Sequence, residues 1–206
     1  MKKIPTLFVV NYRCKGSKGE VTTQVHPKSQ WVYEEEGVIA TQKFDGTAVL
    51  VQEGKLYKRY DVKPTKEAFK RHVAGDFWKL EDFKQVPSNA IRCQEPDLVT
   101  GHFPHWLPCE LGKPEDRYFW EAFNKQKVWV DGTYELCGEK VGINPEKVTG
   151  HSLIKHGSVI VELPDFSFKT VKDFLINPAN DLEGLVLYGK EGKMCKIRKS
   201  DFSVIR

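Results

Sequence analysis

The sequence predicts an α+β protein built around antiparallel β-sheet. Short runs of apolar and β-branched residues recur along the chain, and glycine-containing turns separate many of them. Patterns with helical periodicity are few by comparison. This combination favours antiparallel sheets with a small number of flanking helices.

Two predicted hairpins are the main evidence for antiparallel sheet. Each has two strand-like runs around a short turn: residues 47–52 and 55–60 around Glu53-Gly54, and residues 185–188 and 193–197 around residues 189–192. A further strand-like run, residues 37–41, precedes the first hairpin.

Three helices are expected, over residues 65–74, 114–126 and 170–176. Proline stands in the first turn of the second helix, where its missing N–H costs nothing. Thr170 and Asp173 have the spacing of a capping box at the start of the third. The stretch 63–87, rich in Lys, Glu and Phe, is interpreted as a helical insertion whose charges form a solvated face.

The bulk composition is that of one globular domain spanning residues 1–206. Hydrophobic residues make up 40% of the chain and charged residues 29%, and no linker-like segment divides it. The net charge of +4 permits a polyanionic partner but does not require one.

The sequence also indicates an intracellular protein that does not bind membranes. We find no apolar run of membrane-spanning length and no apolar core or cleavage site of a signal peptide, so we expect a cytoplasmic location. The cysteines are odd in number and scattered, which favours reduced thiols: Cys14, Cys93, Cys109, Cys137 and Cys195.

The first candidate functional residue is Lys43, in Lys43-Phe44-Asp45-Gly46-Thr47 between two strand-like runs. Asp-Gly predicts a turn, with the lysine where one strand leads into the next. A lysine amine is a nucleophile only when it is neutral, and neighbouring cations or a metal ion favour the neutral form. The alternative is a solvated lysine beside an ordinary turn.

Two glutamates form the next candidates. Residues 128–138 are predicted to form a strand, a turn and a strand, and Glu135 within them needs a polar partner. Glu183 stands at the mouth of the buried run 185–187, a position suited to holding a metal ion or a ribose hydroxyl. The alternative for each is a strand-edge charge that prevents aggregation.

The final strand, residues 194–199, places Lys196 and Arg198 on one face by alternation, with Ile197 on the other. Two cations on one strand face repel each other unless an anion lies between them, so this pair predicts a phosphate site. Solvent exposure is the alternative.

A zinc site is a further alternative, because Cys93, His102, His105 and Cys109 lie close together in the sequence. Their spacing is not that of paired CxxC ligands. Packing or surface histidines are therefore the favoured interpretation.

In chain order, five segments resemble the motif series of covalent nucleotidyltransferases, the superfamily of ligases and mRNA capping enzymes: Lys43-x-Asp45-Gly46-Thr47, Arg59, the segment around Glu135, residues 183–186 and residues 196–199. Within that superfamily, residues 40–47, 95–102 and 132–136 are similar to the small ATP-dependent 5′-to-3′ RNA ligases. The similarity covers most of the chain and is weakest over residues 63–87.

The resemblance implies a nucleotidyltransferase fold and a three-step reaction. Lys43 would attack the α-phosphorus of ATP and become adenylylated. The AMP would pass to the 5′-phosphate of an RNA end, and the 3′-hydroxyl of a second RNA end would displace it. RNA ends are therefore the implied partners, and the implied role is RNA repair.

The resemblance also implies roles for individual residues. Glu135 would hold the ribose hydroxyls, Arg59 the ribose and the nucleic-acid phosphate, Glu183 a Mg²⁺ or Mn²⁺ ion, and Lys196 the α-phosphate. The implied catalytic set is Lys43, Glu183, Lys196 and Arg198. The implied nucleotide contacts are Thr41, Gln42, Lys43, Asp45, Gly46, Arg59, Glu135, Glu183 and Lys196.

Two positions depart from the family pattern. Gln42 stands where RNA ligases often carry a glutamate that recognises the adenine amino group, although a glutamine oxygen can also accept from that group. The last motif reads Lys-x-Arg-Lys, so either Arg198 or Lys199 could take the second cationic role, and strand alternation favours Arg198.

Three other functions are alternatives. An ATP-dependent DNA ligase or a GTP-using capping enzyme commonly carries a C-terminal OB-fold, and only seven residues follow Lys199, so we expect none here. A catalytically silent nucleic-acid-binding module need not keep Lys43, Glu183 and Lys196 together.

Overall fold

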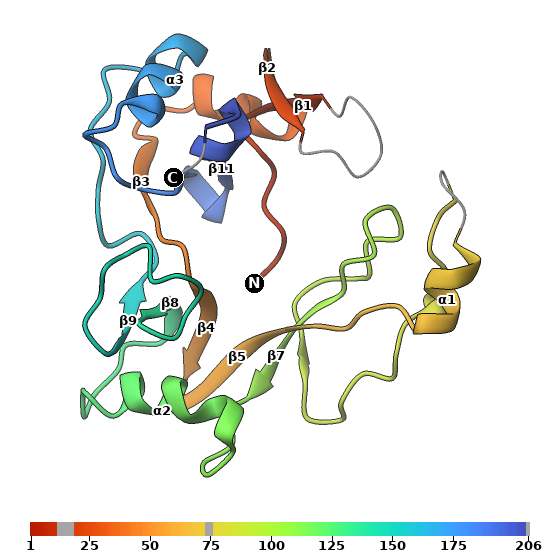
Figure 1. The fold of residues 1–206 in the computed structure, drawn as a ribbon. Coiled ribbons are helices and arrows are strands. Elements are labelled where there is room, and N and C mark those ends of the chain that lie inside the picture. Colours follow the sequence, from red (N-terminus) through yellow and green to blue (C-terminus); the bar gives the residue numbers. More distant parts are fainter. Residues whose placement is uncertain (12–18, 73–75, 205–206) are drawn as a thin grey trace. The chain divides into compact units, whose positions relative to one another are not determined.

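The computed structural model describes residues 1–11, 19–72 and 76–204, and confirms the prediction of a mixed α and β protein with antiparallel sheets and few helices (Figure 1). Its internal contacts group the chain into two compact units. Unit 1 comprises Met1–Lys3 and Gly46–Lys155, and unit 2 comprises Ile4–Asp45 and His156–Arg206. In the described residues, no helix has the length and apolar character needed to cross a membrane.

Unit 1 is built on an antiparallel sheet of six strands. In spatial order these are β6 (Ile91–Arg92), β7 (Pro104–Pro108), β5 (Lys55–Asp61), β4 (Thr47–Gln52), β8 (Gly132–Gly138) and β9 (His151–Lys155). The first predicted hairpin is confirmed, because β4 pairs with β5 and Gln52 lies opposite Lys55. Its turn residues Glu53 and Gly54 have φ of 51° and 71°, as a tight hairpin turn of this hand requires.

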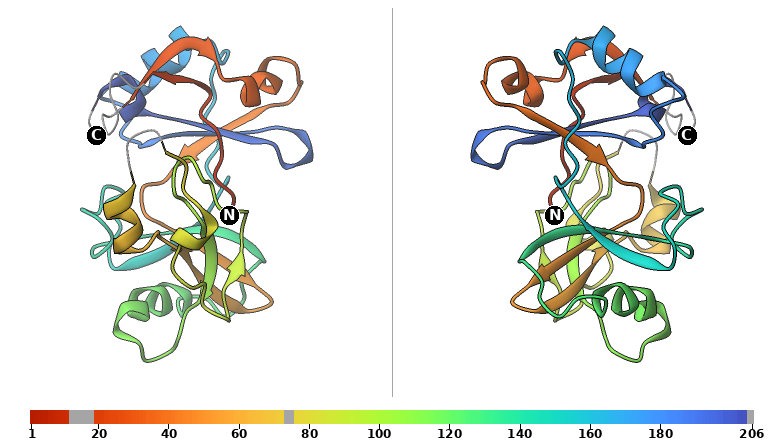
Figure 2. Two further views of the ribbon diagram at one scale, coloured as in Figure 1. Left: turned by 90° about the vertical axis from the view of Figure 1, so that its right-hand side faces the viewer. Right: turned by 90° about the vertical axis from the view of Figure 1, so that its left-hand side faces the viewer.

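The core of unit 1 has two parts. Val49, Val51 and Leu136 are among the buried residues that pack with side chains of α2 (Arg117–Phe123), which follows η3 (Pro114–Asp116). Figure 2 shows these helices in green, below the sheet. A second cluster, around Trp78 and Phe103, lies with α1 (Lys66–Arg71) and η2 (Leu80–Asp82) in the stretch predicted as an insertion.

Two predicted helices are shorter than expected. Thr65 caps α1 by accepting from the Ala68 N–H, but the helix ends at Arg71, and residues 73 and 74 of the prediction lie outside the described residues. The segment 114–126 is divided into η3 and α2, which ends at Phe123.

The predicted strand at residues 128–130 was wrong. Val128 and Val130 are 80% and 63% exposed, so this apolar run has no sheet to cover it. Side-chain hydrogen bonds hold it as a loop instead: the Trp129 indole donates to the Phe123 carbonyl at 2.9 Å, and the Tyr134 hydroxyl donates to the Val130 carbonyl at 2.6 Å. The strand containing Glu135 begins only at Gly132.

Unit 2 contains a three-stranded antiparallel sheet in the order β11 (Met194–Arg198), β10 (Gly184–Tyr188) and β3 (Ile39–Lys43). The second predicted hairpin is confirmed by the β10–β11 pairing, and η4 (Lys190–Gly192) forms its turn. Backbone hydrogen bonds extend both edges, from Lys196 N to Pro5 O at 2.9 Å and from Gln42 N to Val159 O at 2.9 Å. A separate hairpin joins β1 (Phe8–Asn11) and β2 (Glu20–Val25).

One face of this sheet forms the core of unit 2. Leu185, Leu187 and Ile197 are completely buried with Val171 and Leu175 of α3 (Phe168–Ile176). The remaining elements of the unit are η1 (Pro27–Tyr33) and η5 (Lys199–Phe202), which immediately follows β11.

The predicted capping box of α3 was also wrong. The helix begins at Phe168, and Ser167 is its N-cap. The Ser167 hydroxyl accepts from the Thr170 N–H, so Thr170 is the capped residue and not the cap.

The residues around Lys43 do not form a hairpin. Lys43 is the last residue of β3, and Thr47 begins β4, yet the two strands belong to different sheets. Residues 44–46 therefore carry the chain from one sheet to another, which corrects the expectation of a simple Asp-Gly turn between neighbouring strands.

Candidate functional site

The register of the sheet in unit 2 places several candidate residues on one face. Gly184 on β10 lies between Lys43 on β3 and Arg198 on β11. Val186 lies between Thr41 and Lys196 in the same way. Laterally paired residues of a sheet project to the same side, so these four candidates share the face opposite the core. The predicted alternation of Lys196, Ile197 and Arg198 is confirmed, with Ile197 completely buried.

Lys43 and Glu183 form an ion pair on this face. The Lys43 ammonium donates to Glu183 Oε2, and the two side chains are only 23% and 20% exposed. Burial raises the pKa of Glu183, the charge of Asp45 raises it further, and Lys43 opposes both. The site thus holds a carboxylate of increased basicity against the candidate nucleophile.

Lys196 is a second lysine on the same sheet face as Lys43. Burial lowers its pKa, and the nearby charges of Arg198 and Lys43 lower it further. No hydrogen bond or ion pair reaches its ammonium group from the part of the chain that the structure describes. An anion bound here would relieve the repulsion among these cations.

Arg198 is fixed in place by Asp201 of η5. Its Nη2 donates to Asp201 Oδ1 at 2.8 Å and its Nε donates to Oδ2 at 3.3 Å. The same carboxylate accepts the Arg198 backbone N–H at 2.8 Å and is almost completely buried. This two-pronged contact sets the plane of the guanidinium group.

Lys199 has different surroundings from Arg198. Its side chain is buried, and its ammonium donates to the Asn180 carbonyl at 2.9 Å. Its backbone N–H donates to the Glu183 carbonyl at 2.8 Å. Of the two basic residues left as alternatives, only Arg198 lies in the row of Lys43 and Gly184.

The other two candidates on β3, Thr41 and Gln42, lie on opposite faces of the sheet. Thr41 is buried, and its hydroxyl donates to the Val186 carbonyl at 3.2 Å. Gln42 projects to the opposite face from Thr41 and Lys43, beside the edge segment that contains Val159.

Two candidate residues of unit 1, Gly46 and Glu135, lie next to each other at β8. A Cβ on Gly46 would lie 2.2 Å from the Leu136 carbonyl oxygen and 3.0 Å from Glu135 Cγ, so only glycine allows this approach. Glu135 is 8% exposed and lies between Ala48 on β4 and Ile154 on β9.

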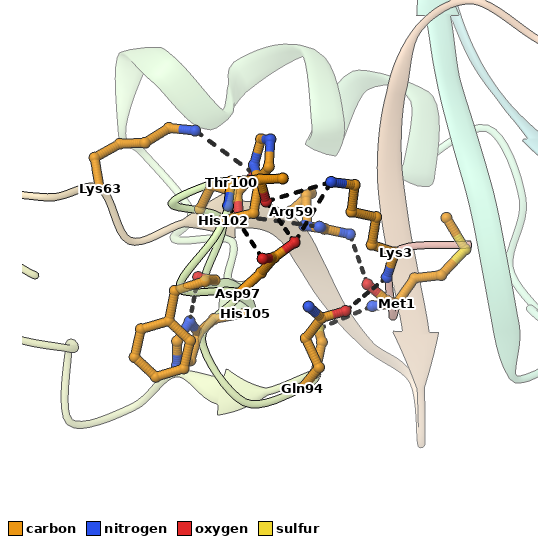
Figure 3. Close-up of polar contacts among 12 residues, drawn as sticks. Met1, Lys3, Arg59, Lys63, Gln94, Asp97, Thr100, His102 and His105 are labelled. Atoms are coloured by element: carbon orange, nitrogen blue, oxygen red, sulfur yellow. Dashed lines mark hydrogen bonds and ion pairs between the residues drawn. The ribbon is translucent and has the colours of Figure 1, made fainter. Parts of the chain in front are cut away.

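Arg59 of unit 1 belongs to a polar cluster around the first residues of the chain (Figure 3). Its Nη1 donates to the Met1 carbonyl at 2.7 Å, and its Nη2 lies 4.0 Å from Asp61 Oδ1. Asp61 Oδ2 also faces Lys63 at 3.8 Å and His102 at 3.4 Å. Arg59 is therefore held by a hydrogen bond to the main chain of Met1 and lies in the field of a carboxylate two residues along its own strand.

The residues considered for zinc have other surroundings. His105 Nδ1 lies 2.9 Å from the Phe103 carbonyl, and burial raises the pKa of the Cys109 thiol to about 12. Within residues 1–11, 19–72 and 76–204, no group of three or more His, Cys, Asp or Glu side chains is arranged to hold a metal ion. The cysteines among them, Cys93, Cys109, Cys137 and Cys195, are free thiols, and Cys14 lies outside these ranges.

Sequence reasoning missed Asp201 and considered Lys199 only as an alternative to Arg198 for the second cationic role. Asp201 lies close after the last motif, yet its contact with Arg198, and that of Lys199 with Asn180, are set by the turn geometry of η5. The spacing of Arg59 and Asp61 was available in the sequence, because residues two apart share a strand face.

Comparison with known proteins does not assign this chain to a family. No protein-family model matches the chain, and no curated protein matches it.

Proposed function

We propose that this protein is an ATP-dependent RNA ligase with a nucleotidyltransferase fold, which joins RNA 5′-phosphate and 3′-hydroxyl ends through AMP bound covalently to Lys43. One observation carries the proposal: a sheet face that holds Lys43, its carboxylate partner Glu183, and the two cations Lys196 and Arg198. An amine beside a carboxylate base and two cations has the parts needed to attack a phosphoryl group. The motif resemblance supplies the identity of the substrates.

In the first step, the Lys43 amine attacks the α-phosphorus of ATP. An N–P bond forms, the bond from the α-phosphorus to the bridging oxygen breaks, and pyrophosphate leaves. Lys43 must first lose a proton, and Glu183 is already hydrogen-bonded to its ammonium group. Because burial raises the pKa of Glu183, this carboxylate is a better proton acceptor than an exposed glutamate.

Lys196 and Arg198 stabilise the charge that develops during this attack. Negative charge spreads over the phosphoryl oxygens in the transition state, and preorganised cations there lower its free energy. Asp201 fixes Arg198 before the nucleotide arrives, so little reorganisation is required.

A divalent cation is compatible with this donor set. Mg²⁺ in phosphoryl-transfer sites is usually held by one or two carboxylates, water and the substrate phosphates, and Glu183 provides such a carboxylate. When bound, Mg²⁺ or Mn²⁺ would neutralise charge on the phosphate oxygens.

The remaining roles follow the motif resemblance. Glu135 would hold the ribose hydroxyls, and Arg59 the ribose and the RNA phosphate. Thr41, Gln42, Asp45 and Gly46 would form the other nucleotide contacts. The proposed setting is RNA repair in the cytoplasm.

Adenylylation of the protein tests this proposal. Purified protein is incubated with ATP or GTP labelled at the α-phosphate and then separated on a denaturing gel. We expect an acid-labile label from ATP that Lys43→Ala abolishes and that Lys193→Ala, on the same sheet's hairpin, retains. The absence of label, or label that survives Lys43→Ala, contradicts the proposal.

The acceptor is tested separately. The adenylylated protein is offered 5′-phosphorylated RNA, 5′-phosphorylated DNA and a nicked duplex, and sealed product is measured. We expect sealing of RNA ends. Sealing of DNA alone would indicate a DNA ligase, and labelling by GTP in the previous assay would indicate a capping-type enzyme.

A further inference from the structure

The segment between α3 and β10 delivers Glu183 to the site, and specific hydrogen bonds hold it. The Asn180 side-chain amide donates to the Phe174 carbonyl at 2.8 Å, which ties the segment to the last turns of α3. The Leu182 N–H donates to the Asn180 carbonyl at 3.0 Å, and Leu182 itself is buried. The Asn180 carbonyl thus lies at the centre of this connection.

Lys199 holds the same segment at two points. Its ammonium donates to the Asn180 carbonyl, and its backbone N–H donates to the carbonyl of Glu183 itself. The Lys199 side chain is only 6% exposed. Burying a lysine is unfavourable unless its charge is satisfied, and here the charge is directed to the backbone that precedes Glu183.

These contacts argue against a phosphate-binding role for Lys199. A lysine that binds phosphate must direct its ammonium at the ligand, as Lys196 can on the face of β11. The Lys199 ammonium is instead committed to a main-chain oxygen of its own unit. Its position next to Arg198 in the sequence suggests the phosphate role, and its contacts indicate another.

We propose that Lys199 is a positioning residue that sets Glu183 against Lys43. The interpretation of Glu183 as proton acceptor and metal ligand rests on the proposed ligase function, but the positioning itself is a property of the free protein. Loss of the Lys199 ammonium would leave the Asn180 carbonyl with the Leu182 N–H as its remaining donor, loosen the segment 180–183 and weaken the Lys43–Glu183 pair.

The reactivity of Lys43 toward an amine reagent tests the proposal without ATP or metal. Trace acetylation with acetic anhydride at pH 8, followed by quantitative mass spectrometry, measures how much Lys43 amine is neutral and accessible. Glu183→Gln removes the carboxylate that accepts the Lys43 hydrogen bond and leaves the amine less engaged, so acetylation of Lys43 should accelerate by roughly tenfold. Lys199→Met, which keeps the apolar stem, should accelerate it in the same direction.

The double variant distinguishes positioning from general loosening. If Lys199 acts through Glu183, then Lys199→Met adds no further acceleration in the Glu183→Gln background, because residues that act as a unit are not additive. Lys193→Met, which removes a lysine paired with Glu35 elsewhere in unit 2, should leave Lys43 acetylation unchanged.

Circular dichroism establishes that each variant is folded. If Lys199→Met does not fold, Lys199→Gln, which keeps a shorter neutral donor, replaces it with the same expected direction. Unchanged Lys43 acetylation in a folded Lys199 variant, or additive acceleration in the double variant, overturns the proposal. Failure of the ligase proposal would appear separately, as absence of protein labelling by ATP in the wild type.

Discussion

At the scale of single residues, Gly46 shows how a short motif can have a packing requirement that its letters do not reveal. Its sequence context, after aspartate, suggests a turn. Its actual constraint is the Leu136 carbonyl oxygen, 2.2 Å from where a Cβ would stand. The sequence identifies the glycine, but only the pairing of β4 with β8 explains it.

Replacing Gly46 with alanine should destabilise unit 1. The clash is with main-chain atoms of β8, which is paired on both sides and cannot move as a flexible side chain would. We therefore expect a loss of about 1–3 kcal/mol in the free energy of unfolding. Urea denaturation measures it. Gly54→Ala, at φ +71° but with open space around it, is the control for backbone strain alone and should cost less. Equal losses in the two variants would contradict the packing explanation.

Lys196→Met should increase the stability of the protein at pH 7 and decrease its activity. The folded protein lowers the pKa of Lys196 below the ordinary 10.5, chiefly by burial, so its ammonium destabilises the fold at neutral pH. This penalty is present below the folded-state pKa and is relieved as pH rises through it. We therefore expect the variant to unfold at a higher temperature than wild type at pH 7, with the difference shrinking toward pH 10.

The same Lys196→Met substitution should lower the rate of adenylylation by roughly 100-fold, the effect of losing one preorganised donor to a developing charge. Single-turnover labelling with ATP measures this rate. A variant that is less stable at pH 7 would assign Lys196 a structural role, and labelling at the wild-type rate would contradict its role in catalysis.

At the scale of elements, the two hairpins and the Lys196–Arg198 alternation were predictable because strand periodicity and turn residues are local signals. The start of α3 was not, because Ser167 and Thr170 are both capable caps and only the geometry of the preceding loop decides between them. The apolar run at residues 128–130 misled for a similar reason. Its apolar character says nothing about whether a neighbouring strand is present to pair with it.

The cap of α3 can be tested directly. Ser167→Ala removes the hydroxyl that accepts from the Thr170 N–H and should cost about 1 kcal/mol of stability. Thr170→Ala keeps that acceptor and should cost less, and thermal unfolding of both variants measures the difference. The opposite order would restore Thr170 as the capping residue.

The contact between η5 and β11 gives a further prediction at this scale. Asp201→Asn removes the carboxylate charge that holds the Arg198 guanidinium while keeping an oxygen for the backbone N–H of Arg198. Because Arg198 would lose its fixed orientation, adenylylation should slow by roughly tenfold. In an Arg198→Ala background the same change should have little further effect, and an additive loss in single-turnover labelling would assign Asp201 a separate role.

At the scale of the whole molecule, the sequence contains no composition break that marks the grouping of contacts into two units. Each unit is assembled from segments distant in the chain, and residues 44–46 lead from one sheet to the other. The order of the motifs could be read from the sequence. The supporting contacts of Lys199 and Asp201 could not, because they depend on how η5 turns after the last strand.

The central claim is that Lys43 is the residue that becomes adenylylated. Incubation of the intact protein with ATP and Mg²⁺, followed by peptide mapping with mass spectrometry under non-acidic conditions, locates the adduct most directly. We predict a single AMP group on the peptide that contains Lys43, with the fragment ions placing it on the lysine nitrogen. An AMP group on another residue, or no adduct on a folded protein, would contradict this account.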